Sequence, residues 1–376
     1  MRKKLICFAT LLITLFSTTF TFAQNSAVDM NNYITLLVTQ GAEINLNILL
    51  SDASDEVKIV SGSVEQNILN DGQASIIANS DTIRVYGKML MFDCSDNGAS
   101  ISSVDASQHT ELAVLVCSNN GLTSVNINGC FSLQVLNCSE NSLTNLNLDG
   151  CPNLQYLECW ENPLTSLDFS HCPNIMIIDC SECQISNINL SGCTALETLY
   201  CYENQLSSAD ISTCSSLRDV DFDDNNFSSL SMDEIFCQLP ERNPEDEAII
   251  NVALDPTDEI IWATNKDNAT NKNWRVTYYN ETENEKYDFP ATNGTRSCQE
   301  LSNLTEIPSM EISIYPNPAK NEIIFGNVFN ELVEVFDSNG RLVRQEIIRE
   351  KLNIEDLSSG VYYIRIKDVT KKLIKE

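Results

Sequence analysis

Leucine and cysteine recur along the middle of the chain with a period of 21 residues. One unit, residues 133–151, has the pattern L-x-x-L-x-C-x-x-N-x-L-x-x-L-x-L-x-x-C. Alternating apolar positions predict a short strand around Val135–Ser139, and the asparagine that follows predicts a turn. One unit cannot bury its own apolar residues, so we expect the units to stack on a continuous core. The cysteines form two columns: Cys117, Cys138, Cys159, Cys180 and Cys201, and Cys130, Cys151, Cys172, Cys193 and Cys214.

This repeat resembles the leucine-rich repeat with cysteine in place of the third leucine. Over residues 91–230 it is similar to the cysteine-bearing, short-repeat internalin-like proteins of bacteria. The resemblance implies a mainly β solenoid and a role at cell surfaces in adhesion or partner binding. We expect the amides of one asparagine column to bond the turn backbone, with a small local loss where Cys183 interrupts it. That column is Asn97, Asn120, Asn141, Asn162, Asn204 and Asn225.

The flanks of the repeat do not share its period, and we interpret them as caps that shield the open ends of the solenoid. Residues 24–90 contain β-rich runs separated by polar turns, which predicts an N-terminal cap. Residues 231–300 predict a C-terminal cap with a helix at Met232–Leu239 and strands at Ile249–Leu254 and Trp274–Tyr279. Residues 301–307 are interpreted as a linker.

The chain begins with the features of a secretory signal peptide. Arg2, Lys3 and Lys4 precede an apolar run, and small residues end at Ala23. We therefore expect residues 1–23 to be removed on export. The alternative is a membrane anchor, but the apolar run is short for a span of about 20 residues.

The last part of the chain, residues 308–376, alternates apolar and polar positions between Asn-Gly and Ser-Gly turns, which predicts a small β-sandwich. It opens on Tyr315-Pro316-Asn317-Pro318, continues to Gly360 and Tyr362, and ends on a basic stretch with Lys371 and Lys372. This order of motifs resembles the C-terminal sorting domain of type IX secretion, a system of the Bacteroidota. The resemblance implies export across the outer membrane, removal of the domain by a sortase-like peptidase and, often, attachment to surface lipopolysaccharide. The alternative is an ordinary terminal β-domain. The motif residues are Tyr315, Pro316, Asn317, Pro318, Gly360, Tyr362, Lys371 and Lys372.

Charge is distributed unevenly along the chain, whose formal net charge is −30. Residues 24–307 carry 10 Lys and Arg against 42 Asp and Glu, whereas residues 308–376 carry 10 against 11. The acidic part would repel nucleic acid and anionic lipid. The change in charge balance also supports a domain boundary near residue 308.

The cysteine columns replace core leucines, so we expect them to point inward as small apolar residues. Stacked side chains run parallel, whereas a disulfide needs a dihedral angle near 90°, so we expect free thiols. Cys180 and Cys183 form a C-x-x-C only formally, because they belong to different columns. Cys237 and Cys298 lie outside the columns and are the only plausible disulfide, which the sequence leaves open.

The sequence contains no arrangement typical of an active site. Its two histidines, His109 and His171, have no cysteine or histidine partner at catalytic spacing. There is no phosphate loop or dinucleotide fingerprint. We expect no cofactor, no metal site and no enzymatic activity, with a carboxylate-based hydrolase as an alternative.

The strand side of the solenoid is the predicted binding face, because solenoids present it as an extended surface. We expect outward-facing aromatic and acidic side chains there, in contact with solvent: Tyr156, Glu158, Trp160, Asp179, Tyr200 and Tyr202. An acidic row runs beside them, comprising Glu140, Glu161, Glu182, Glu203 and Asp224. Residues 91–230 hold 18 acidic residues and one basic residue, Arg218.

These observations predict an exported recognition or adhesion protein whose partner is a protein with a basic surface. Calcium prefers oxygen clusters such as the acidic row, but the chain contains no EF-hand-like loop, so we rank a basic partner first. A structural surface-coat component is a further alternative.

Overall fold

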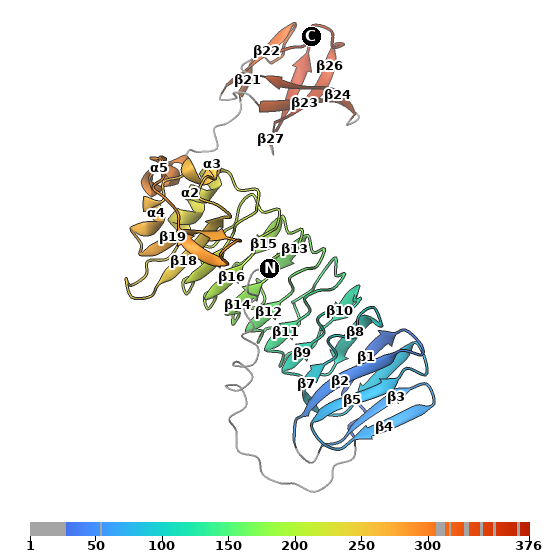
Figure 1. Ribbon diagram of the computed structural model, residues 1–376. Coiled ribbons are helices and arrows are strands. Elements are labelled where there is room, and N and C mark those ends of the chain that lie inside the picture. Colours follow the sequence, from blue (N-terminus) through green and yellow to red (C-terminus); the bar gives the residue numbers. More distant parts are fainter. Residues whose placement is uncertain are drawn as a thin grey trace. The chain divides into compact units, whose positions relative to one another are not determined.

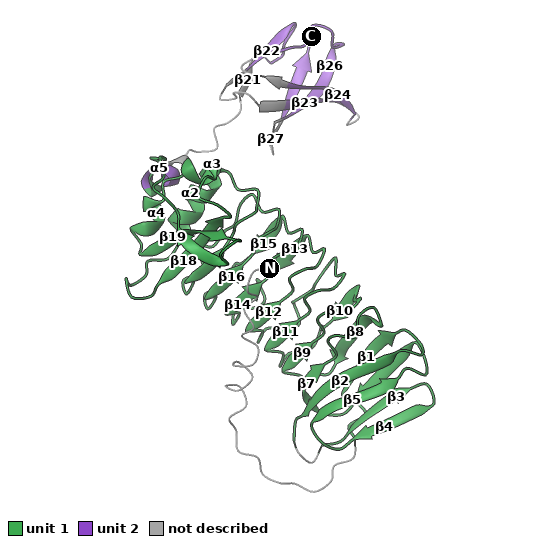
Figure 2. Cartoon of the chain, viewed as in Figure 1, with its two compact units in different colours: residues 1–298 green, residues 299–376 purple. Residues whose placement is uncertain are grey.

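The computed structural model describes residues 28–52, 55–305 and most of 313–376. The signal peptide predicted at residues 1–23 lies outside the described residues. The chain divides into two compact units, residues 1–298 and residues 299–376 (Figure 2). Each unit is described by itself.

Unit 1 is a β-solenoid of about nine turns (Figure 1). From Val114 to Asp221 its strands pair in parallel with a shift of 21 residues, so that Val135 lies between Val114 and Tyr156. The shift is 23 residues at the first pair, Met91 with Val114, and 30 where Asp219 pairs with Ile249. This register follows directly from the period of the sequence, and it confirms the predicted leucine-rich-repeat fold. The stacked strands are β7 (Met89–Asp93), β9 (Val114–Val116), β11 (Val135–Asn137), β12 (Tyr156–Glu158), β14 (Ile177–Asp179), β16 (Thr198–Tyr200), β17 (Asp219–Asp221) and β18 (Ala248–Ala253).

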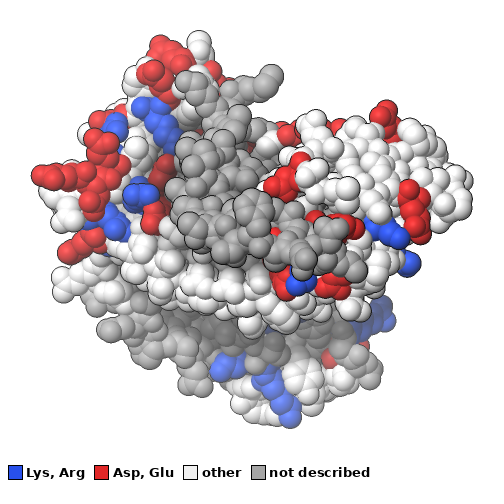
Figure 3. Space-filling model, turned by 90° about the horizontal axis from the view of Figure 1, so that it is seen from below, with Lys and Arg blue, Asp and Glu red and all other residues white. Residues whose placement is uncertain are grey.

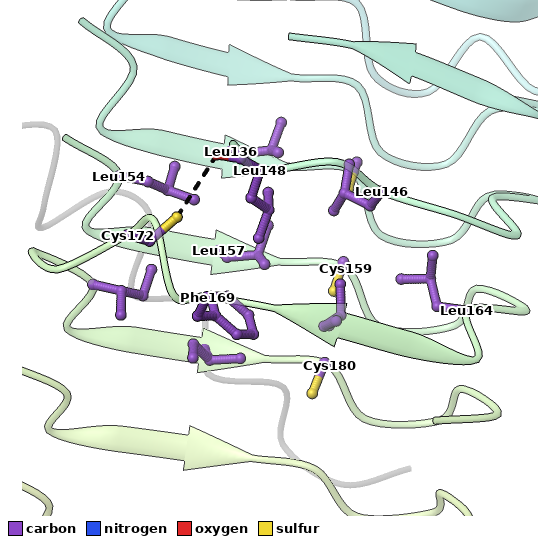
Figure 4. Close-up of a cluster of buried hydrophobic side chains, with 14 of the residues drawn as sticks. Leu136, Leu146, Leu148, Leu154, Leu157, Cys159, Leu164, Phe169, Cys172 and Cys180 are labelled. Atoms are coloured by element: carbon purple, nitrogen blue, oxygen red, sulfur yellow. Dashed lines mark hydrogen bonds between the residues drawn. The ribbon is translucent and has the colours of Figure 1, made fainter. Parts of the chain in front are cut away.

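The interior of the solenoid is filled by the leucines and by both cysteine columns (Figure 4). Cys159 and Cys180 are fully buried, as expected. The cysteines of both columns are free thiols, which agrees with the argument from parallel stacking. In the second column, the thiols of Cys130, Cys151, Cys172 and Cys193 point at backbone carbonyl oxygens of the preceding coils, as Cys172 Sγ does toward Leu148 O at 3.9 Å. Burial raises the pKa of Cys172 to about 11, so the thiol form predominates.

The asparagine column bonds the turn backbone as predicted. Asn162 Nδ2 donates to the carbonyl oxygens of Cys138 and Cys159, both at 3.0 Å, and its Oδ1 accepts the N–H of Leu143 at 2.9 Å. Each asparagine therefore joins its own coil to the one before it. At the interruption, Cys183 offers only a weak bond, from Sγ to Cys159 O at 3.5 Å.

The N-terminal cap is a β-sandwich whose two sheets continue into the solenoid. On the strand side, β2 (Glu43–Leu50) pairs with β7, and β5 (Gly72–Ile77) pairs with the outer side of β2. The sheet thus reaches twelve strands without exposing the first coil. The second sheet has six strands: β1 (Tyr33–Val38), β3 (Val57–Ser61), β4 (Val64–Ile68), β6 (Thr82–Tyr86), β8 (Ile101–Gln108) and β10 (Ser124–Asn126).

The cap and the first coil are joined by hydrogen bonds between strands on both sides of residue 90. Strand β7, which contains residue 90, pairs with β2 of the cap. Strand β8, which follows the first coil, pairs with β1 of the cap and with β10 of the next coil. The back of the solenoid continues with two further short strands, β13 (Ser166–Asp168) and β15 (Asn187–Asn189).

The C-terminal cap combines helices with the last strands of the long sheet. Helix α2 (Ser229–Gln238) and strands β18 and β19 (Trp274–Asn280) occur close to their predicted positions, and β20 (Glu285–Asp288) adds the final strand. Two short helices, α3 (Glu259–Trp262) and α4 (Asp267–Thr270), lie between them. Helix α5 (Cys298–Thr305) covers much of the segment expected to be a linker.

Three connections hold this cap together. A disulfide joins Cys237 to Cys298 across 61 residues, which answers the question that the sequence left open. Arg296 Nε donates to the fully buried carboxylate of Asp233 at 2.8 Å. Lys272 Nζ caps the end of α2 through the carbonyl oxygens of Cys237 and Leu239, at 2.5 and 2.9 Å.

Unit 2 contains a small all-β domain, as predicted. One sheet consists of β21 (Ser313–Tyr315), β22 (Glu322–Gly326) and β25 (Lys351–Asn353), and the other of β23 (Glu331–Asp337), β24 (Leu342–Ile348), β26 (Gly360–Ile366) and β27 (Val369–Lys375). Asn317 ties the two motif ends together, because it donates to Lys372 O at 2.7 Å and accepts the N–H of Ile374 at 2.9 Å. Tyr362 is buried in the core and donates to Ser358 O. Pro316 lies outside the described residues.

Candidate partner-binding face

The strand side of unit 1 presents rows of side chains whose character changes along the solenoid. Its first coils carry an apolar cluster, separate from the solenoid interior, that contains Val114, Val116, Val135 and Tyr156. Its last coils carry carboxylates. Residues that share a row lie about 4.8 Å apart, because that is the spacing of neighbouring strands.

Most of the aromatic and acidic side chains predicted at the centre of this face are less exposed than we expected. The structure leaves Tyr156 with 2% of its surface exposed, Glu158 and Asp179 with 8%, Trp160 with 9% and Tyr202 with 5%. Tyr200 is half-buried. Large side chains in closely spaced rows cover each other and the small residues between them, such as Ser139 and Ser181, which are almost fully buried. The sequence shows which way these side chains point but not how tightly they pack.

Glu158 is the centre of a hydrogen-bonded group on β12. It accepts bonds from Tyr156 Oη and from Asn137 Nδ2, both at 2.5 Å. Burial raises the pKa of Glu158 to about 7, although both hydrogen bonds oppose the shift. The structure therefore brings Tyr156 and Glu158 together, as two of the predicted site residues.

A lysine of the C-terminal cap lies over the acidic end of the face. Lys286 Nζ, on β20, is 3.6 Å from Asp219 Oδ1, 3.4 Å from Asp221 Oδ2 and 5.5 Å from the ring centre of Tyr200. Burial opposes its charge, but Asp221 and Asp219 outweigh that effect and raise the pKa of Lys286. Sequence reasoning missed Lys286 because it lies outside the repeat, and no periodic signal links it to Tyr200.

Beneath this lysine, two buried carboxylates accept hydrogen bonds from one neutral amide. Asn251 Nδ2 donates to Asp221 Oδ1 at 3.0 Å and to Asp223 Oδ2 at 2.6 Å, and Thr277 Oγ1 donates to Asn251 Oδ1 at 3.2 Å. Tyr200 Oη donates to Asp219 Oδ2 at 2.6 Å. The last coil therefore keeps several carboxylates close together on a single face.

The acidic row lies at the turn that follows each strand, and every member has a positive φ. The values are 54° for Glu140, 52° for Glu161, 54° for Glu182, 53° for Glu203 and 47° for Asp224. Four of these side chains are exposed, and that of Glu182 is half-buried. In the two preceding coils, Asp96 and Asn119 occupy the same position, also with positive φ. Acidic side chains outnumber basic ones in the view of Figure 3.

Across residues 28–52, 55–305 and the described parts of unit 2, no group of three or more His, Cys, Asp or Glu could hold a metal ion. His109 is fully buried, and His171 is exposed and lies 3.2 Å from Asp149 on the back of the solenoid. Within the same residues, no helix is long and apolar enough to cross a membrane.

The end of the chain matches a known family. Residues 313–376 match the model of the secretion system C-terminal sorting domain. The chain carries a type IX sorting domain. It is therefore an exported protein that is released or held on the outer cell surface, and the predicted sorting motifs lie in a domain of the expected kind.

Comparison with solved structures returns leucine-rich-repeat proteins, and no curated protein matches the sequence. The functional domain of InlJ from Listeria monocytogenes, which includes a cysteine ladder, is 17% identical over 80% of this chain and 94% of its own, with a TM-score of 0.33. Internalin C2 from the same organism is 19% identical over 37% of this chain and 74% of its own, with a TM-score of 0.30. The protein LIC12759 from Leptospira interrogans is 17% identical over 46% and 57%, with a TM-score of 0.29.

Proposed function

We propose that this protein is a non-enzymatic recognition or adhesion module that binds a protein partner with a basic surface through the strand side of its solenoid. The observation that carries the proposal is the acidic row at the left-handed turns. It lies along the rim of the face, where an extended partner can reach every coil.

The row is costly for the fold, and this supports a role in binding. A left-handed backbone costs a residue with a side chain about 1–2 kcal/mol, and asparagine, aspartate and glycine tolerate it best. Four consecutive coils nevertheless place glutamate there. Like charges at neighbouring coils also repel each other. Neither feature stabilises the solenoid, whereas both suit a basic partner that spans several coils.

The central residues of the face extend this proposed site toward the C-terminal cap. The ring of Tyr200 and the carboxylate of Asp221 already contact one ammonium group, that of Lys286. The chemistry of this end of the face is therefore compatible with lysine or arginine side chains of a partner. Tyr156, Glu158, Trp160, Asp179 and Tyr202 would support the contact surface from beneath.

The test starts from capture of partners with the mature exported protein as bait, followed by binding measurements on variants. The double substitution Glu161→Lys/Glu182→Lys should weaken binding strongly, and Trp160→Ala should weaken it less. Raising the salt concentration should weaken wild-type binding, because exposed charges are screened within about 8 Å at physiological ionic strength. The matched control is Asp149→Lys/Asp168→Lys, which makes the same change of charge on the back of the solenoid.

If the Glu161→Lys/Glu182→Lys variant binds the partner as tightly as the wild type, and the control Asp149→Lys/Asp168→Lys does not bind it, the partner site lies on the back of the solenoid.

Processing is tested separately by the intact mass of the exported protein. We expect the mature form to lack residues 1–23 and most of 308–376. A surface form that ends at Glu376 would contradict removal of the sorting domain.

A further inference from the structure

A polar cleft of about 480 Å³ lies on the outer face of the N-terminal cap, at the end of the twelve-stranded sheet. Three adjacent strands, β5, β2 and β7, supply its walls. Alternation along each strand places the apolar residues in the cap interior and the polar ones in the cleft. Its polar lining consists of Asn45, Asn47, Gln73, Ser75, Asp93, Ser95 and Asp96, and the remaining lining residues are Leu46 and Ala74.

The register brings the polar side chains of the cleft into direct opposition. Asn45 lies opposite Ser75, and Asn47 lies opposite both Gln73 on one side and Asp93 on the other. Directly opposed side chains have Cβ atoms about 4.5–5.5 Å apart. The amides of Asn47 and Gln73 and the carboxylate of Asp93 therefore form one continuous row across three strands.

The hydroxyl groups and carboxylates of the cleft are partly engaged within the protein. Ser75 Oγ donates to Glu43 at 2.7 Å, and Ser95 Oγ donates to Asp93 Oδ1 at 2.7 Å. Asn97 holds the backbone of Asn45 through two hydrogen bonds, at 2.8 and 2.9 Å. These bonds fix the walls of the cleft to the first turn of the solenoid.

In contrast to these hydroxyls and carboxylates, the side-chain amides of Asn45, Asn47 and Gln73 make no hydrogen bond within the described part of the chain. Each amide offers two donor hydrogens and an acceptor oxygen. Three such groups, two on β2 and one on β5, form a preformed surface of donors and acceptors. Among the strands that the structure describes, none pairs with the outer side of β5, so the cleft is open at that edge.

We propose that this cleft binds a neutral saccharide. A sugar hydroxyl both donates and accepts a hydrogen bond, so two neighbouring hydroxyls match the donor and acceptor of one amide. The carboxylates of Asp93 and Asp96 accept from further hydroxyls and repel phosphate, sulfate or uronate groups, and no Lys or Arg lines the cleft. The lining offers too little apolar surface for a hydrophobic peptide.

The cleft lies at the N-terminal end of the same sheet, beyond the acidic row from Glu140 to Asp224 that the proposed partner would contact. Apolar residues, including Val114 and Val116 of β9, separate the cleft from the acidic coils. Binding in the cleft should therefore be insensitive to salt, whereas partner binding on the acidic row should weaken with it. The two proposals can fail independently.

The experiment measures binding of neutral hexasaccharides to the mature protein by titration calorimetry and by saturation-transfer NMR. The panel contains linear β-1,3-glucan, β-1,4-glucan, mannan, xylan and galactan fragments. We expect at least one to bind. Asn47→Leu and Gln73→Leu should each weaken it about tenfold, because each removes hydrogen bonds and leaves sugar hydroxyls unpaired. The controls Asn145→Leu and Asn187→Leu remove exposed amides from the back of the solenoid and should leave affinity unchanged.

Three results would overturn the proposal. One is the absence of binding by every saccharide in the panel to the folded wild type. Another is wild-type affinity in both the Asn47→Leu and Gln73→Leu variants, which would show that these amides do not contact the sugar. The third is loss of binding in EDTA, which would show that a cation rather than the amides holds the sugar. The variant Glu161→Lys/Glu182→Lys should bind the saccharide normally.

Discussion

The coils and the C-terminal cap of unit 1 hold cysteine in opposite chemical states. In the coils, the cysteines of both columns are free and buried, although Cys180 Sγ and Cys201 Sγ are only 3.1 Å apart. In the cap, Cys237 and Cys298 are joined, with 5.4 Å between their Cα atoms.

The difference depends on which structural elements cover each region. Each coil is covered on both sides by an almost identical coil, so a thiol stabilises it as a small apolar group. The cap has no further coil to cover it. It consists of non-repeating helices and strands, which are joined by the disulfide, by the Asp233–Arg296 pair and by Lys272 at the end of α2. Repetition thus replaces specific cross-links inside the solenoid but not at its end.

The largest effect is expected from removal of the cap disulfide. The double substitution Cys237→Ala/Cys298→Ala should lower the free energy of unfolding of the cap by about 4 kcal/mol, because it frees a loop of 61 residues in the unfolded chain. Denaturant unfolding followed by Trp274 fluorescence measures this. In reductant, the wild type should unfold at the same denaturant concentration as the variant. If reductant leaves the free energy of unfolding of the cap unchanged, the disulfide does not stabilise the cap as proposed.

A substitution in the cysteine ladder should have a smaller but clear effect. Cys159→Ser places a hydroxyl in a fully buried apolar site and should cost about 1–3 kcal/mol. Thiol counting provides a companion measurement. The ladder thiols should react only after denaturation, and a disulfide within either column of the native protein would contradict the packing argument.

A substitution at Cys183 should increase the stability of the solenoid rather than decrease it. Cys183→Asn restores the asparagine column and should raise the stability of the solenoid by about 1 kcal/mol, because new bonds reach Cys159 O and Cys180 O. The reverse change, Asn162→Cys, is the matched control and should destabilise. If the first variant is less stable than the wild type, the site has adapted around the thiol.

The smallest effect concerns the junction between the N-terminal cap and the first coil. His109 is fully buried there, with Nε2 3.1 Å from Gly87 O, and burial lowers its pKa while Glu111 and Asp29 oppose the shift. The unfolded chain takes up the proton near pH 6.5, whereas the folded protein does so only at lower pH. The contribution of neutral His109 to the free energy of unfolding is therefore complete above about pH 6.5, and it is lost as the pH falls toward the pKa of His109 in the folded protein.

The variant His109→Gln cannot titrate, so it should lose this part of the pH dependence. Unfolding experiments at several pH values between 5 and 8 compare the two proteins. An unchanged slope in the variant would assign the effect to other groups.

The sequence by itself determined the features that repeat. A period of 21 residues was enough to predict the parallel register, the inward cysteine columns and the bonds of the asparagine column, because equivalent residues of stacked coils have equivalent surroundings. The sorting domain was recognisable from short motifs near its two ends, Tyr315–Pro318 and Gly360–Lys372.

The tertiary structure decided everything that depends on residues with no periodic relation. Lys286 meets Asp221 and Tyr200 only because the cap folds back on the last coil. The exposure of Trp160 and Tyr202 depends on how neighbouring side chains of unequal size fill the same face. The saccharide cleft depends on the pairing of β5, β2 and β7. Contacts between distant, non-repeating segments are set by packing, and a pattern along the chain carries no record of them.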